Sequence, residues 1–412
     1  LKKLIDKLPR SLQEHPAITY LKNTNFIKKE SSGRDISIFC GMTDEIWTPE
    51  TAKTKGIGGS EEAIVNLAPR LQKLGWNVTV YANVGHQELE FEGVRWMPTY
   101  SWNYRNKEDV TIIWRSPKPV DFNINSDVIV VDLHDVMSYP YEFNKTRQKK
   151  IDRLFVKTKA HQYIIQKKSM EPIPDDKFRI IPNGLEVDTF NQLEKRDPYY
   201  LLNTSSANRG LDVLLDLYEE ALARVPEEIR KKVKLGWFYG WGVFDTVHKG
   251  DKAMTDWKDM VMQKFEKLKE KGIVEGGGRL SHPEINRKYL QAGALVYPTR
   301  FYEIHCISAA KAQAAGCVPI TTNFAALDET VRYGYKINAH ELPDLINGNS
   351  MGLTNTQSRK EWVDALVDYL MNPYRMDRSA MAAWAKNEFD WNKVAKGWSY
   401  ELNDLLQKKK VA

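Results

Sequence analysis

The feature of this sequence that most constrains its fold is an alternation of short apolar runs with segments of helical periodicity, which occurs twice along the chain. In the first half, apolar runs at 35–41 and 77–82 flank a segment at 59–75 whose apolar residues recur at helical spacing. In the second half the pattern restarts at 199–206, and apolar runs again alternate with helical segments as far as 318–322. Short strands that alternate with helices indicate βαβ units and parallel sheets. The sequence therefore predicts an α/β protein with two doubly wound domains.

The length of the chain also favours two domains, because 412 residues exceed one ordinary hydrophobic core. We predict that the two halves divide near 190–198 and that 1–34 forms an N-terminal extension. The extension is basic, loosely amphipathic and interrupted by Pro9 and Pro16. A membrane-surface helix is the alternative interpretation of this segment.

Composition narrows the functional classes. The formal net charge of +6 is mild for this length, and the lysines do not interleave with aromatic residues as in proteins that bind single-stranded nucleic acid. Three cysteines without CxxC spacing argue against a disulfide framework or a zinc site and fit a reducing cytoplasm. No apolar run approaches the roughly 20 residues of a membrane span. We therefore expect a cytoplasmic protein without a nucleic-acid partner or a bound metal, for which peripheral contact with a membrane surface is an option.

Four segments that follow predicted strands carry candidate chemistry, and the first is glycine-rich. The segment 54–63, TKGIGGSEEA, places Gly58 and Gly59 just before a helix, where backbone amides can approach a sugar or a diphosphate. It is neither GxGxxG nor a Walker loop, so it predicts neither nicotinamide nor P-loop chemistry. The alternative is a flexible loop that Ser60 caps.

The second segment is VVDLHDV at 130–136, in which His134 follows a strand directly. A histidine at the carboxyl end of a strand can hydrogen-bond a sugar hydroxyl or act as an acid or base. The alternative is a structural histidine.

The third segment is NTSSANRGLDVLL at 203–215. A strand ends there in small polar residues that include Ser205, and Arg209 precedes a helix. An arginine beside the free amides of a helix start can bind a diphosphate. The alternative is a surface arginine that pairs with Asp212.

The fourth segment, FYEIHCISAAKAQAAGC at 301–317, follows an apolar run and begins an alanine-rich helix. Amides at the start of this helix suit a phosphate. A phosphate would repel Glu303, so its carboxylate predicts a ligand with hydroxyl groups. The alternative is a simple N-terminal charge on the helix.

Together these segments resemble the family 4 glycosyltransferases of the GT-B fold over roughly 35–410. The resemblance is carried by GIGGSEEA, LHD, IIPNGLEVDTF, RGLDVLL, GRLSHPEI, YPTRFYE…AAGCVPI and FDWNKVAKGW. It implies a Rossmann-like acceptor domain over 35–192 and a Rossmann-like donor domain over 193–390, which face each other across a cleft. It also implies that a C-terminal helix over 391–412 crosses back to the first domain.

The activity that the resemblance implies is metal-independent transfer of a sugar, with retention, from a nucleotide-diphosphate sugar. No cofactor is implied, and a UDP-sugar donor is favoured. The acceptor would be a glycan, a lipid-linked sugar or a small molecule. Aromatic residues such as Trp96, Trp102 and Tyr139 suggest that it docks on the loops 84–108 and 136–148.

Residue by residue, the resemblance places Gly58 and Gly59 near the donor phosphates and His134 on the donor sugar. Arg209 stands where the family generally has a lysine on the diphosphate. Glu303 matches the first glutamate of the family's Glu-x7-Glu pair, which contacts the sugar hydroxyls. Catalytic roles are thus implied for His134, Arg209 and Glu303.

The remaining donor contacts follow the same resemblance. The amides of Ile304, His305 and Cys306 would face the sugar and the phosphate, Ser205 would belong to the donor site, and Glu329 matches a family acid.

The sequence departs from the family pattern at two positions. Lys311 replaces the second glutamate, which usually binds the ribose, and Thr204 replaces an arginine that many members have. A lysine has three donors and no acceptor, so it could reach ribose oxygens or phosphate, or it could lie in solvent. These departures leave open a catalytically silent sugar-nucleotide or glycan-binding relative. A sugar-nucleotide epimerase on the same two-domain plan is a further alternative, for which His134 and Glu303 would have to serve as acid and base.

Overall fold

The computed structural model describes residues 9, 12, 15, 18, 27–43, 45–341 and 352–411. The chain divides into two compact units. Unit 1 contains 1–52, 57–184 and 391–412, and unit 2 contains 53–56 and 185–390. The sequence placed the division at 192/193, and the units divide at 184/185.

Unit 1 is built on an eight-stranded sheet in the order β3-β4-β2-β1-β5-β6-β7-β8. Its pairings are parallel except for the antiparallel pair β3 and β4. The strands are β1 (Asp35–Phe39), β2 (Asn77–Ala82), β3 (Leu89–Phe91), β4 (Val94–Pro98), β5 (Glu108–Trp114), β6 (Ser126–Asp132), β7 (Arg153–Val156) and β8 (Phe178–Ile180).

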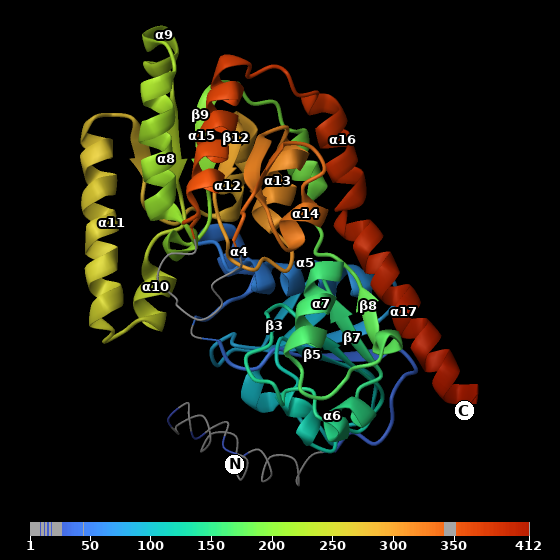
Figure 1. Cartoon of the computed structure of the whole chain (residues 1–412). Coiled ribbons are helices and arrows are strands. Elements are labelled where there is room, and N and C mark those ends of the chain that lie inside the picture. The colour runs from blue at the N-terminus through green and yellow to red at the C-terminus, as the bar shows by residue number, and fades with distance from the viewer. Residues whose placement is uncertain are drawn as a thin grey trace. The chain divides into compact units, whose positions relative to one another are not determined.

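Helices cover this sheet, and α5 shows why the sequence forms them. Its residues Ile64, Leu67, Ala68 and Leu71 recur on one face and are almost fully buried. The α-helices outside unit 2's main segment are α4 (Pro49–Thr54), α5 (Gly59–Lys73), α6 (Lys145–Lys150), α7 (Lys159–Lys168) and α17 (Trp391–Val411). In Figure 1, α17 is the red helix that runs past β7 and β8. It also packs on α5 and β6, so the end of the chain completes the core of unit 1.

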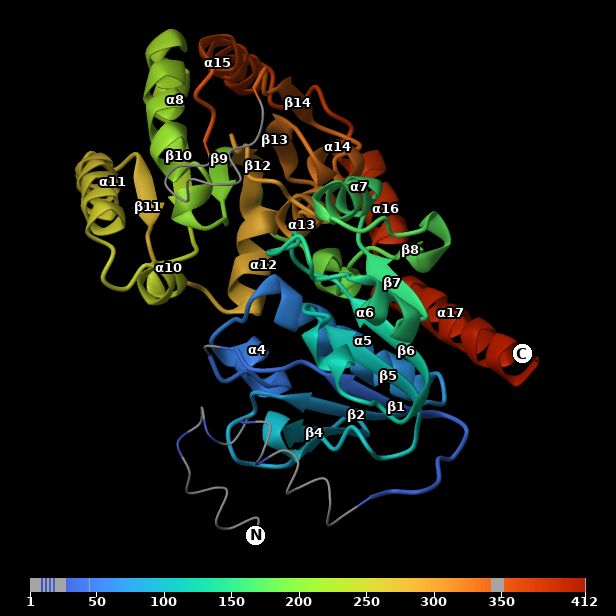
Figure 2. The ribbon, with the colours of Figure 1, turned by 60° about the horizontal axis from the view of Figure 1, so that its bottom comes forward.

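Unit 2 is built on a parallel six-stranded sheet in the order β11-β10-β9-β12-β13-β14. The strands are β9 (Asp197–Asn203), β10 (Lys234–Trp237), β11 (Val274–Gly276), β12 (Ala292–Tyr297), β13 (Val318–Asn323) and β14 (Tyr335–Asn338). Figure 2 shows β9, β12, β13 and β14 next to one another. β12 is buried along its whole length, as expected of a central strand that helices cover on both faces.

The helices of unit 2 include the pair α8 and α11, which lie side by side in Figures 1 and 2. They are α8 (Leu211–Arg224), α9 (Glu227–Arg230), α10 (Gly242–Val247), α11 (Lys252–Glu270), α12 (His282–Gln291), α13 (Ile307–Ala315), α14 (Ala326–Thr330), α15 (Thr356–Met371) and α16 (Arg378–Glu388). Short 3-10 helices are η1 (Thr99–Ser101), η2 (Lys118–Asp121), η3 (Asp175–Lys177), η4 (Val187–Asn191) and η5 (Ala207–Arg209).

The α/β architecture predicted from the sequence is confirmed, and four short strands were missed. Two of these, β3 and β4, form an edge hairpin that turns at Glu92 and Gly93, both with positive φ. Positive φ at both central residues defines a tight hairpin turn, but the runs on either side are too short and too polar to show a clear period. Most of the amphipathic helix considered for 1–34 falls outside the described residues.

Candidate functional site

In unit 2 the carboxyl ends of the paired strands β9 and β12 bring two of the predicted residues together. Arg209 ends η5, which follows β9, and Glu303 lies in the loop that follows β12. Arg209 Nη1 donates to Glu303 Oε1 at 3.1 Å, and the guanidinium lies 3.8 Å from the centroid of the Phe301 ring. The predicted alternative, in which Arg209 pairs with Asp212, is therefore wrong.

The carboxylate of Glu303 is fixed by a second donor. The Tyr297 hydroxyl donates to the same Oε1 at 2.7 Å, and burial together with the Glu303 charge raises the pKa of Tyr297, so that it stays protonated. The Glu303 side chain is 8% exposed, whereas that of Arg209 is 34% exposed. A guanidinium has five N–H donors, so Arg209 can keep Glu303 and still donate to an anionic ligand.

Around Thr204, where the family often has a cation, the structure holds a cluster of hydroxyl groups. Thr204 Oγ1 lies 2.5 Å from the Tyr289 hydroxyl and 3.0 Å from Ser308 Oγ in the first turn of α13. The neighbouring Ser205 is buried. Its backbone amide donates a hydrogen bond to Asn203 Oδ1, and its carbonyl accepts one from Trp237 Nε1. These backbone contacts hold the loop that follows β9 in place.

The start of α13 holds the next predicted residues. Cys306 is its N-cap, and burial, followed by the Glu303 charge, raises the pKa of its thiol well above the usual value. The buried His305 ring packs edge-on against Phe389 at 5.5 Å, and Ile304 is partly exposed. The Cys306 thiol is therefore a poor nucleophile.

Lys311 lies in the second turn of α13 and is only 7% exposed. The interpretation in which this lysine lies in solvent is therefore wrong. Its neighbours Ala309, Ala310 and Ala312 are fully buried, so the alanine-rich helix packs closely. Glu329, by contrast, is exposed on α14.

The other predicted residues belong to unit 1, where His134 follows β6 and forms a buried cluster with Asp132 and Lys157. Its Nε2 lies 2.8 Å from Asp132 Oδ2, and Lys157 Nζ lies 2.5 Å from Asp132 Oδ1. Burial, followed by the charge of Lys157, lowers the pKa of His134, and the net effect on Asp132 is also a lowered pKa. A neutral His134 that donates from Nε2 to the Asp132 carboxylate satisfies both groups, which leaves Nδ1 as its acceptor.

Gly58 and Gly59 begin α5, with Gly58 as the N-cap in an extended conformation. The cap suggested for Ser60 is therefore wrong, because Ser60 lies inside the first turn. A Cβ added to Gly58 would lie 2.3 Å from Glu61 Oε2, the mobile end of a side chain. The space next to Gly58 thus holds a carboxylate, which itself lies 3.6 Å from Arg115 Nη1.

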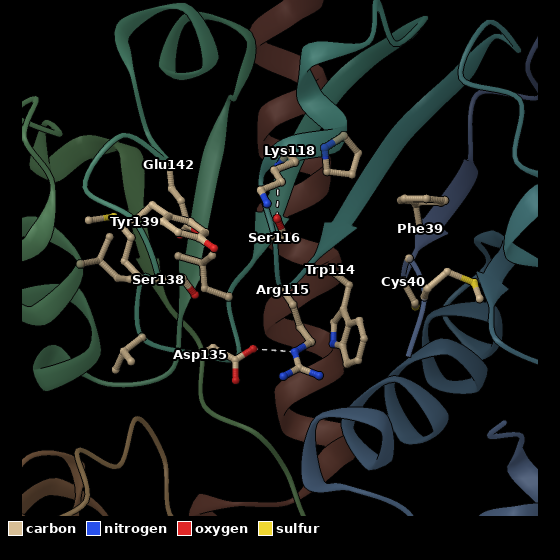
Figure 3. Close-up of a pocket in the computed structure, with 17 residues that line it drawn as sticks. Phe39, Cys40, Trp114, Arg115, Ser116, Lys118, Asp135, Ser138, Tyr139 and Glu142 are labelled. Carbon is tan, nitrogen blue, oxygen red and sulfur yellow. Dashed lines mark hydrogen bonds and ion pairs between the residues drawn. The ribbon is translucent and has the colours of Figure 1, made fainter. Parts of the chain in front are cut away.

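Unit 1 also contains a pocket of about 360 Å³ at the carboxyl ends of β1, β5 and β6 (Figure 3). Tyr139 of the loop 136–148 lines it. Trp96 and Trp102 are buried in the core, so the prediction that they contact an acceptor is wrong. Arg115, which ends the run VTIIWR at 110–115, also lines the pocket and was missed. The signal that could have found it was its place as the last residue of a predicted strand.

Clusters of metal ligands and membrane-spanning helices are both absent from the described part of the chain. There, no group of three or more His, Cys, Asp and Glu side chains is arranged to hold a metal ion. Within the same residues, no helix combines the length and apolar character needed to cross a membrane.

The paired α/β units define the GT-B fold, which solved glycosyltransferase structures share with this chain. Sucrose-phosphate synthase from Thermosynechococcus elongatus matches with a TM-score of 0.65 and 13% identity over 91% of this chain and 100% of that one. HepE from Anabaena, in complex with UDP, matches with a TM-score of 0.58 and 13% sequence identity, over 90% of this chain and 100% of HepE. Trehalose-6-phosphate synthase matches with a TM-score of 0.61 and 12% sequence identity, over 90% of this chain and 99% of the synthase. No family model and no curated protein sequence matches.

Proposed function

We propose that the protein is a retaining glycosyltransferase of the family 4 type, which transfers a sugar from a nucleotide-diphosphate sugar to a hydroxyl group without a metal ion. The observation that carries this proposal is the Arg209–Glu303 pair at the carboxyl ends of β9 and β12. Ligands of open α/β sheets bind beyond the carboxyl ends of the strands. The pair offers a cation for a diphosphate and, beside it, a carboxylate oxygen for sugar hydroxyls.

Similar structures support the choice of donor. HepE has been solved with UDP and with UDP-glucose, and the structure of trehalose-6-phosphate synthase was analysed for glycosyl transfer with retention. We therefore propose a UDP-sugar as donor. His134, Gly58, Gly59, Ser205, Glu329 and the amides of residues 304–306 are proposed as further donor contacts on the family resemblance.

The chemistry requires stabilisation of the negative charge that develops on the departing diphosphate. Arg209 is held in place by Glu303 and by the Phe301 ring, so it needs little reorganisation during the reaction. The amino end of α13 adds the partial positive charge of a helix dipole. Glu303, with one oxygen bonded to Arg209 and Tyr297, can use its other oxygen to orient the sugar.

Replacement of Arg209 tests this proposal. We expect Arg209→Ala to lower kcat by a factor on the order of 10²–10³, the effect of removing one preorganised group that stabilises transition-state charge. Arg224→Ala is the matched control, because Arg224 lies on α8 in the same unit and pairs with Asp364 at 2.6 Å. Equal turnover by the two variants would contradict the role of Arg209.

The metal-free proposal is tested with a chelator. We expect EDTA to leave the rate of sugar transfer unchanged, because Arg209 and the α13 amides supply the charge stabilisation. A loss of activity that Mn²⁺ restores would overturn this part of the proposal.

Lys311 is proposed to contact the nucleotide. It lies in the second turn of α13, roughly 7.5 Å along the helix from the N-cap Cys306, a depth that suits the ribose or the diphosphate rather than the reacting carbon. We expect Lys311→Ala to weaken UDP binding by ~1.5–3 kcal/mol, the range for hydrogen bonds to charged groups. Calorimetric titration with UDP measures this, and unchanged affinity in a folded variant would exclude the contact.

Incubation with radiolabelled UDP-, GDP- and ADP-sugars separates the proposal from the other two classes. A glycosyltransferase transfers or slowly hydrolyses the sugar with retention, an epimerase returns an isomerised donor, and a silent relative binds the donor without turnover.

A further inference from the structure

The residues proposed to contact the donor do not indicate which acceptor the protein uses. The pocket in unit 1 offers evidence on this point. It lies beyond the carboxyl ends of three neighbouring strands, where α/β sheets bind ligands. Its volume of about 360 Å³ is within the lower part of the range for small-molecule sites. The inference drawn from it rests on the proposed glycosyltransferase function and concerns the chemical class of the acceptor.

The backbone of Arg115, at the edge of this pocket, has an unusual conformation. Arg115 has a φ of +65°, in the left-handed region that residues other than glycine rarely adopt. Two backbone bonds hold this turn, from the Arg115 amide to the Asp132 carbonyl and from the Ser116 amide to the Trp114 carbonyl, both at 2.8 Å. Such conformations cost about 1–3 kcal/mol and concentrate at binding and active sites. The strained backbone at Arg115 therefore indicates that the position of this side chain in the pocket has a function.

The turn delivers the Arg115 guanidinium to carboxylates. Its Nε lies 2.5 Å from Asp135 Oδ2, the contact drawn in Figure 3, and its Nη1 lies 3.6 Å from Glu61 Oε1. The guanidinium carbon also lies 5.0 Å from the centroid of the Trp114 ring. Two carboxylates around one cation make this end of the pocket neutral to negative, so Arg115 is poorly available to a second anion.

The rest of the lining is balanced in the same way. Besides Arg115 and Asp135, the charged residues that line the pocket are Lys118 and Glu142, one of each sign. Lys118 Nζ lies 5.4 Å from the centroid of the Tyr139 ring. Figure 3 shows Tyr139 on the side of the pocket opposite Phe39. Because the residue is 60% exposed, its ring is accessible to a ligand.

We propose that this pocket binds a neutral sugar ring of the acceptor, which packs on Tyr139, and that the Arg115–Asp135 pair selects against phosphorylated or otherwise anionic acceptors. Neutral sugars present hydroxyl groups that can bond the paired charges without disrupting them, and C–H faces that suit an aromatic ring. An anionic sugar would have to compete with Asp135 for Arg115 and would face two uncompensated carboxylates.

The charge part of the proposal is tested by comparing glucose and maltose with glucose 6-phosphate in binding titrations of the full chain, followed by tryptophan fluorescence in the absence of donor. We expect the parent protein to bind a neutral sugar more tightly than the phosphate. Asp135→Asn releases Arg115 and should shift the ratio of affinities toward the phosphate by about tenfold or more, the effect of one charge-assisted hydrogen bond.

Asp127→Asn is the matched control. Asp127 lies near the start of β6, the strand that precedes Asp135 in the sequence. Its side chain is 46% exposed against 48% for Asp135, and it also pairs with a cation, Lys107. It should leave the ratio unchanged. Tighter binding of glucose 6-phosphate by the parent protein, or equal ratios for the parent protein and Asp135→Asn, would overturn the proposal.

The aromatic part is tested with Tyr139→Ala, which should weaken binding of the neutral sugar roughly three- to tenfold. Tyr163→Ala is its control, since Tyr163 is also 60% exposed in unit 1 but does not line the pocket. Equal affinities of both variants for the sugar would contradict the proposal, as would the absence of any sugar binding by the parent protein. UDP titration of the same samples keeps the two proposals apart, because intact UDP binding without sugar binding refutes only the inference about the acceptor.

Discussion

Two histidines of unit 1 are held in environments that disfavour their charged form. His161 is fully buried at the start of α7, where its Nδ1 accepts from the Lys157 amide at 3.2 Å and its Nε2 lies 3.1 Å from the Asp135 carbonyl. Burial lowers the pKa of His161 to about 3. The pKa of His134 is lowered as well, first by burial and then by Lys157.

These pKa values predict a pH-dependent stability. In the unfolded chain a histidine has a pKa of about 6.5, so between that pH and about 3 the unfolded state binds a proton that folded His161 does not. The contribution of His161 to the stability of unit 1 is thus fully present above pH 6.5 and is lost as the pH is lowered, with a slope approaching about 1.4 kcal/mol per pH unit. His134 adds a contribution of the same sign. Urea unfolding between pH 4.5 and 7.5 measures the slope.

Substitution of His161 identifies its share of this slope. His161→Asn should destabilise the protein at neutral pH but reduce the slope. Ile165→Ala removes buried contacts one turn later on α7 and keeps the histidine, so it should preserve the slope. Identical slopes in the parent protein and His161→Asn would show that another group titrates.

At the scale of elements, α17 is attached to unit 1 by both apolar and charged contacts. The Trp398 ring packs edge-on against Phe155 at 4.3 Å, and the Trp76 Nε1 donates to Ser399 at 2.9 Å. Glu401 is buried and pairs with Arg153 at 3.0 Å and with Arg179 at 3.2 Å. These contacts make the helix an integral part of unit 1.

Two substitutions that are close in sequence test this attachment. Trp398→Ala should lower the free energy of unfolding by about 3–5 kcal/mol, the usual cost of removing a buried tryptophan. Tyr400→Ala should change it by less than about 0.5 kcal/mol, because that side chain is 71% exposed on the opposite face. Chemical denaturation compares the two, and equal effects would mean that α17 contributes little to the stability of unit 1.

At the scale of the whole molecule, the chain leaves unit 1 after residue 184, forms unit 2, and returns to unit 1 at 391. The returning segment supplies Trp391, Val394, Trp398, Leu402 and other members of the main apolar cluster of unit 1. The core of unit 1 therefore closes only when the last part of the chain is present.

Truncation of the chain after Asp390 tests this dependence. The shortened protein should lose the thermal unfolding transition of unit 1 or show it at a much lower temperature, whereas the transition of unit 2 should persist because 185–390 contains its core. Calorimetry of the two proteins measures both transitions. Retention of both at unchanged temperatures would show that the core of unit 1 does not depend on the returning segment.

The sequence by itself determined the alternation of strands and helices, because the burial of one or both faces of an element produces a regular spacing of apolar residues along its sequence. Strand β2 was predicted with its observed bounds, and the amphipathic α5 within a few residues. The sequence also selected Arg209 and Glu303, since both follow strands in segments that match a known motif. It did not determine β3, β4, β11 and β14, which have three to five residues each and too few positions to show a period.

Only the tertiary structure decided which candidates meet and which are buried. Arg209 and Glu303 are 94 residues apart and pair because β9 and β12 are neighbours in the sheet. Packing around α13 decided that Lys311 is buried, and packing in two separate apolar clusters of unit 1 buried Trp96 and Trp102. The position of the Arg115 side chain in the pocket depends on a left-handed backbone turn and on its ion pair with Asp135 of a neighbouring loop. Each of these outcomes depends on contacts between residues distant in the sequence, which no local pattern encodes.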